Sequence, residues 1–88
     1  MKISMEVYEN IAGQFFKEGH KNYEALPRGL MEEAKEVAEA NNDEGVIDEL
    51  GDVLWYVTVL LKQKGSSLGE AMIANINKLE RRALNGKD

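Results

Sequence analysis

The architecture of this chain is dictated by one segment, 49-ELGDVLWYVTVLL-61. Apolar residues run almost unbroken from Val53 to Leu61, directly after the acids Glu49 and Asp52. A helix that is apolar on nearly every side must be buried on nearly every side. Charged groups beside a core are costly unless something pairs with them, so the two acids need a partner.

The residues around this segment predict further helices. Pro27 is the only proline, and alternating β-branched residues are scarce, so we predict an all-α, four-helix bundle-like domain of antiparallel helices. Caps are expected at Ser4, at Asn42 or Asp43, and at Ser67, where Ser67 and Glu70 form a capping box. The expected helices cover about residues 5–18, 27–40, 44–64 and 68–85, with residues 19–26 as a loop.

The apolar third helix also predicts a partner chain. The three other helices of an 88-residue chain are too few to cover every side of the third helix. We therefore expect the chain to oligomerise through this helix. Apolar stripes on the other helices predict the rest of the core. We expect Trp55 and Tyr56 in the core or the interface, and Tyr8, Phe15 and Phe16 in the core.

Composition excludes several kinds of protein. The length favours one domain, residues 1–88, and the absence of cysteine excludes a disulfide framework or a cysteine zinc site. A net charge of −5 argues against binding nucleic-acid polymers or acidic membranes. The longest apolar run is too short for a membrane span, which needs roughly 20 residues. The first ten residues lack a secretory apolar segment, so we expect a cytoplasmic protein.

Two pairs of acids have the same helical spacing. Glu33 and Glu36 are three residues apart, as are Glu49 and Asp52, so each pair lies on one helix face, about 5 to 6 Å apart at Cβ. Glu32 adds another acid beside the first pair. If the second and third helices form an antiparallel hairpin, the two pairs face each other beside the core.

Four carboxylates that meet near a core repel one another. Either shared protons raise their pKa values or a hard cation binds them, and oxygen ligands without cysteine suit Mg²⁺ or Mn²⁺. Such a site indicates phosphoryl or nucleotidyl chemistry. The spacing alone leaves open that these are ordinary solvated acids. The only histidine, His20, is expected in a loop, which argues against a di-iron site.

The order of these elements resembles a known family. Glu32-Glu33-x-x-Glu36, then Glu49-x-x-Asp52 within "DELGDVLWYVTVL", and "NINKLERR" at 75–82 are similar to the signature of the MazG-like nucleoside triphosphate pyrophosphohydrolases. These enzymes belong to the all-α NTP pyrophosphatase superfamily. The resemblance covers roughly residues 5 to 82. It implies hydrolysis of a nucleoside triphosphate to a monophosphate and pyrophosphate, with Mg²⁺ or with Mn²⁺ as a substitute.

The resemblance also implies roles for single residues. Metal ligands would be Glu33, Glu36, Glu49 and Asp52. Glu32, with Glu33 and Glu36, would be catalytic, and Glu32 would orient or activate the attacking water. Asn75, Lys78 and Arg82, which share one helix face, would bind phosphate or sugar. The family also implies a homodimer or a homotetramer built as a dimer of dimers.

Two alternatives stay open at this point. In the first, the protein is a related member of the superfamily that acts on dUTP or phosphoribosyl-ATP. In the second, it is a helical dimerisation or regulatory module without catalytic activity. The twelve residues between the two acidic motifs, "VAEANNDEGVID", form a short connection, which leaves the base preference of the site open. The loop at residues 19–26 is the local candidate for a lid that contacts the base.

Overall fold

The structure, a computed structural model, describes residues 1–19 and 23–86. In this part of the chain it has four α-helices, a short 3₁₀ helix and no strand, which confirms the all-α prediction. His20 and the neighbouring part of the expected loop lie outside the described residues. Residues 23–25 of that loop are described and form the 3₁₀ helix. The elements are α1 (Met5–Gly19), η1 (Tyr23–Ala25), α2 (Leu26–Glu39), α3 (Asp43–Gln63) and α4 (Leu68–Leu84).

Local hydrogen bonds explain where these helices start and end. Ser4 Oγ accepts from the Val7 N–H of α1 (3.1 Å), and Asn42 Oδ1 accepts from the Gly45 N–H of α3 (2.8 Å). Each bond satisfies an N–H that has no partner within the helix. Gly65, with φ of +72°, lies just after α3 in the left-handed region that glycine adopts without strain. The start of α1 and both ends of α3 therefore follow from local chemistry.

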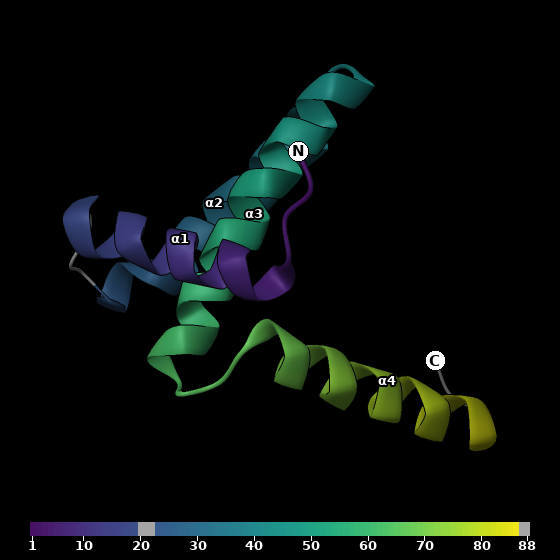
Figure 1. Cartoon of the computed structure of the whole chain (residues 1–88). Helices are drawn as coiled ribbons and strands as arrows, with labels where there is room; N and C mark the ends of the chain where they lie inside the picture. The colour runs from purple at the N-terminus through teal and green to yellow at the C-terminus, as the bar shows by residue number, and fades with distance from the viewer. Residues whose placement is uncertain (20–22, 87–88) are drawn as a thin grey trace.

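The core is small and lies where α1 crosses the hairpin of α2 and α3 (Figure 1). Phe16 of α1 packs against Trp55 of α3, with ring centroids 6.1 Å apart, and Trp55 meets Tyr56 edge-on at 5.0 Å. Phe15 was expected in the core but is 63% exposed, because α1 turns only the face of Phe16 toward α3. The buried residues are Ala12, Phe16, Leu26, Thr58 and Val59.

α4 extends away from the other three helices (Figure 1). Every residue from Met72 to Leu84 is exposed. The apolar stripe that the sequence predicts on this helix therefore has no partner within the described chain. The predicted stripe is Leu68, Met72, Ile76 and Leu79 with Ile73 alongside, and all of these are exposed except Leu68, which is half-buried.

The hairpin depends on a close approach at Gly29 of α2. A Cβ built on Gly29 would lie 2.6 Å from Cζ and 2.8 Å from Oη of Tyr56, so the tyrosine ring would have to move. Overpacking of this kind costs about 1 to 3 kcal/mol, and the better helix propensity of alanine returns up to about 1 kcal/mol. We expect Gly29→Ala to lower the unfolding free energy by about 1 to 2 kcal/mol in urea denaturation.

Gly51 of α3 provides the matched control. A Cβ there meets nothing within 4 Å, so Gly51→Ala should stabilise the protein by roughly 0.5 to 1 kcal/mol through helix propensity alone. Equal stability of the two variants would contradict the close packing of Tyr56 on α2.

Candidate functional site

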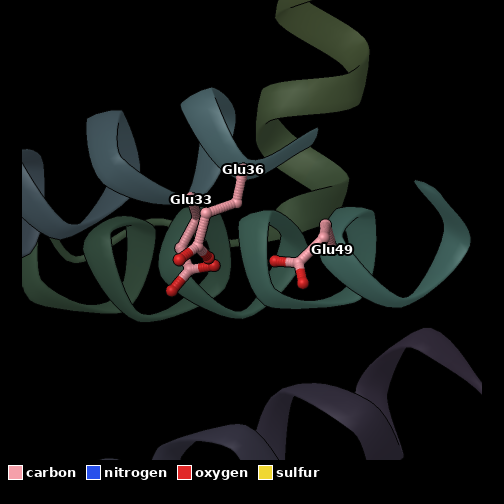
Figure 2. Close-up of side chains that lie close together, drawn as sticks. All are labelled: Glu33, Glu36 and Glu49. Carbon is pink, nitrogen blue, oxygen red and sulfur yellow. The ribbon is translucent and has the colours of Figure 1, made fainter. Parts of the chain in front are cut away.

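Three carboxyl groups converge between α2 and α3. Glu33 and Glu36 come from α2 and Glu49 from α3, and each offers an oxygen that lies within 4.8 Å of the others' (Figure 2). The i, i+3 spacing on α2 puts the first two on one face. The capped turn at Asn42 returns the chain so that Glu49 faces them. The predicted meeting of the two acidic motifs is thus realised for these three residues.

The electrostatics of this group are unfavourable without a bound ion. A hydrogen bond to the Glu36 carboxyl raises the pKa of Glu33 to about 7, with burial and the charges of Glu36, Asp52 and Glu49 acting in the same direction. The pKa of Glu49 is also raised, first by its hydrogen bond to Glu36, then by burial and by neighbouring acids. No basic side chain appears among these causes. Glu36 therefore links the other two acids, and the cluster must bind either protons or a cation.

Two oxygen atoms of the cluster are buried without a hydrogen-bond partner. They are Oε2 of Glu33 and Oε2 of Glu49. A buried carboxylate oxygen without a partner carries a desolvation cost. The donor set contains only oxygen, which suits Mg²⁺ or Mn²⁺ better than softer metals. The residues present therefore fit a hard divalent cation.

Asp52 and Tyr8 lie at the edge of the cluster. Asp52 is exposed and is not one of the three converging acids, but its charge raises the pKa values of Glu33 and Glu49. Tyr8 of α1 is half-buried, and burial followed by the Asp52 charge raises its pKa. The sequence assigned Tyr8 only to the apolar stripe, and nothing in its spacing showed that α1 crosses α3 beside Asp52.

The other predicted site residues lie elsewhere. Glu32 is exposed on α2, outside the group of converging acids. Asn75, Lys78 and Arg82 are exposed on α4, where Lys78 and Arg82 line a surface hollow together with Arg81 and Asn85. A separate recess of about 340 Å³ adjoins the acids at the α2–α3 turn, between Glu36, Asn41 and Glu49. The single chain therefore does not bring the acidic and basic candidates together.

The raised pKa of Glu33 predicts a pH dependence of stability. Between its ordinary value of 4.5 and about 7, the folded state holds a proton that the unfolded state has lost. Linkage then makes the unfolding free energy fall as pH rises through this window. In EDTA we expect the melting temperature to decrease as the pH rises from about 5 to about 8. The Glu33→Gln variant should show a smaller decrease, and the control variant Glu44→Gln should show the same decrease as the parent protein.

Mg²⁺ should offset this decrease in melting temperature, because the ion competes with the proton for the same carboxylate oxygens. At about ten times its dissociation constant, the ion adds about 1.4 kcal/mol to stability, or about 5 to 10 °C in melting temperature for a domain of this size. The gain should be larger at the upper end of this pH range than at the lower end. A melting temperature in EDTA that rises with pH would contradict the acid cluster.

Comparison with known proteins supplies an independent finding. The model of a family described as MazG nucleotide pyrophosphohydrolase domain matches residues 21–86, which is most of the chain. Neither the curated proteins nor the solved structures contain a significant match. Among the described residues, no helix is both long and apolar enough to cross a membrane.

Proposed function

Because the chain belongs to the family of MazG nucleotide pyrophosphohydrolase domains, we propose that it is a Mg²⁺-dependent nucleoside triphosphate pyrophosphohydrolase. The reaction converts a (d)NTP and water to a (d)NMP and pyrophosphate, in house-cleaning or regulation of the cytoplasmic nucleotide pool. The whole chain, residues 1–88, acts as the single domain. Mn²⁺ is the expected substitute ion.

One observation carries this proposal beyond family membership. The oxygens of Glu33, Glu36 and Glu49 converge within 4.8 Å, and two of these carboxyl groups have a buried oxygen without a partner. Carboxylates alone would repel a triphosphate. A divalent cation supplies the positive charge that lets such a cluster bind one, and stabilises the charge that develops on its oxygens.

In the proposed mechanism, Glu33, Glu36, Glu49 and Asp52 would hold the ion, which would offset the negative charge of the triphosphate. Glu32 orients the attacking water and accepts its proton. The water oxygen bonds to the α-phosphorus, the bond from that phosphorus to the bridging oxygen breaks, and pyrophosphate leaves with the electron pair. Lys78 and Arg82 bind phosphate oxygens and offset the charge of the leaving group. Asn75, on the same face of α4, binds phosphate or sugar.

Assembly of several copies completes the site in this proposal. The separation of the α4 side chains from the acids within one chain supports a site shared between copies, in a homodimer or a dimer of dimers. Exposed apolar side chains on one face of α3 and on one face of α4 support the same view, because exposed apolar patches indicate a protein interface. On α3 they are Ile47, Leu50 and Leu54, and on α4 they are Met72, Ile73, Ile76 and Leu79.

The direct test is pyrophosphate release from a panel of canonical and modified NTPs and dNTPs, in Mg²⁺ and in EDTA. The panel includes dUTP and phosphoribosyl-ATP, the substrates of the related alternative. Release that requires Mg²⁺ supports the proposal and identifies the preferred base. A folded, oligomeric protein that hydrolyses nothing would favour the other alternative, a non-catalytic dimerisation or regulatory module, which the exposed apolar surface also fits.

A further inference from the structure

The first turn of α4 is capped by a side chain from α1. Glu9 Oε2 accepts a hydrogen bond from the Leu68 N–H at 2.9 Å, across 59 residues of sequence. The first N–H groups of a helix have no partner within the helix, and a negative charge near them is favoured by the helix dipole. Ser67 satisfies a different group, the Glu70 N–H, at 3.2 Å. The helix thus has one local cap and one cap from a distant helix.

α1 contacts the start of α4 at a second point. A Cβ built on Gly69 would lie 3.8 Å from Cε of Met5, so the Met5 side chain in the first turn of α1 lies beside the first turn of α4. Beyond Ala71, which is half-buried, every described residue of α4 is exposed. Within the described chain, α4 is therefore held at its first turn only.

A helix held at one end amplifies small changes in direction. Leu68 and Arg82 are about 14 positions apart, or roughly 21 Å along the helix axis at about 1.5 Å per residue. A tilt of about 20° at the first turn therefore moves Arg82 by roughly 7 Å. Misplacing a binding group by about 1 Å is already enough to reduce a reaction rate strongly.

We propose that Glu9 is a positioning residue, which sets the direction in which α4 leaves its own chain to pack against a second copy, and thereby the location of Asn75, Lys78 and Arg82. The inference rests on the proposed function in so far as these three residues bind the substrate. Glu9 itself is not one of the converging acids. It is suited to this task because α1 also packs on α3, the helix that carries Glu49 and Asp52, so a single helix contacts both the acid-bearing helix and the start of α4.

The kinetic test compares Glu9→Ala with Glu9→Gln. Alanine removes the acceptor, and we expect KM for the preferred triphosphate to rise roughly 10-fold. We expect kcat to fall as well, because Lys78 and Arg82 also offset the charge of the leaving group. Glutamine keeps an acceptor oxygen and should restore KM to within about threefold of the parent. In a Lys78→Ala/Arg82→Ala background, Glu9→Ala should leave KM unchanged. An equal rise in both backgrounds would show that Glu9 is only a stabilising cap and overturn the proposal.

A second measurement needs no activity. The chain contains no cysteine, so spin labels attached through Glu44→Cys on α3 and Glu80→Cys on α4 report the direction of α4. The labelled chain is diluted with unlabelled chain so that only distances within one copy are measured. We expect Glu9→Ala to broaden the distance distribution, and Ser67→Ala, which removes only the local cap, to broaden it less.

The two measurements separate the possible failures. A distribution that stays unchanged in Glu9→Ala would overturn the role of Glu9, whatever the enzyme does. A parent protein that releases no pyrophosphate would overturn the proposed function, while the label distances would still show whether Glu9 holds α4.

Discussion

Glu36→Gln is expected to reduce Mg²⁺-dependent pyrophosphate release by about 100- to 1000-fold, the usual cost of losing one group that stabilises charge in a transition state. Glu36 is the shared member of the acid cluster, because the carboxyls of both Glu33 and Glu49 hydrogen-bond to it. Glutamine has nearly the same shape but no negative charge, so it removes the charge of a metal ligand without removing volume. The measurement is kcat/KM for the preferred substrate, together with the affinity for Mn²⁺ by calorimetry.

Stability separates this effect from misfolding. The amide introduced by Glu36→Gln can donate to the neighbouring carboxylates, and one like charge is gone, so the metal-free protein should be at least as stable as the parent at about pH 8. Glu44→Gln, which neutralises an exposed acid in the first turn of α3, should keep full activity. A Glu36→Gln protein that retains activity and Mn²⁺ affinity would refute the metal role of this cluster.

Ile76→Asp is expected to dissociate the oligomer without unfolding the chain. Ile76 lies in the apolar stripe of α4 and is 54% exposed in the single chain, so a charge there costs the isolated fold little. At a buried interface, an unpaired carboxylate costs several kcal/mol, which weakens association by at least roughly 100-fold. Sedimentation velocity over a range of concentrations measures this shift, and circular dichroism measures the retained helix.

Ala74→Asp is the matched control, because Ala74 is also exposed on α4 but lies two residues before Ile76, on a different side of the helix from the stripe. It should leave association unchanged. If the site is shared between copies, Ile76→Asp should also lose pyrophosphate release at concentrations where it is monomeric. An Ile76→Asp protein that associates as tightly as the parent would place the interface elsewhere.

The acidic part of the candidate site was largely accessible to sequence reasoning, and the rest of it was not. Spacing of three residues within one helix puts Glu33 and Glu36 on one face whatever the tertiary structure does. The same spacing pairs Glu49 with Asp52, whose charge acts on the cluster from its edge. Neither spacing nor resemblance indicated that Tyr8 lies beside Asp52 or that Glu9 caps α4, because both relations join helices far apart in sequence.

At the start of α4, one hydrogen bond of the capping box was predicted from the sequence and the other bonds were not. The sequence predicted that Ser67 caps the Glu70 N–H, as it does. The Glu70 carboxylate, which the capping box would direct back to the Ser67 N–H, instead accepts from the Ser66 hydroxyl at 3.1 Å. The Leu68 N–H, in the first turn of the same helix, donates to the Glu9 carboxylate.

By itself the sequence determined the all-α class, the ends of the helices and the faces that carry the acids, since these depend on hydrogen bonds and side-chain spacing within about four residues. Only the tertiary structure decided which acids converge, how closely α2 approaches α3 at Gly29, and where α4 leaves the body. These features depend on contacts such as Gly29 with Tyr56 and Glu9 with Leu68. Such contacts exist only after packing has brought distant helices together, because no local pattern encodes the distance between two helices.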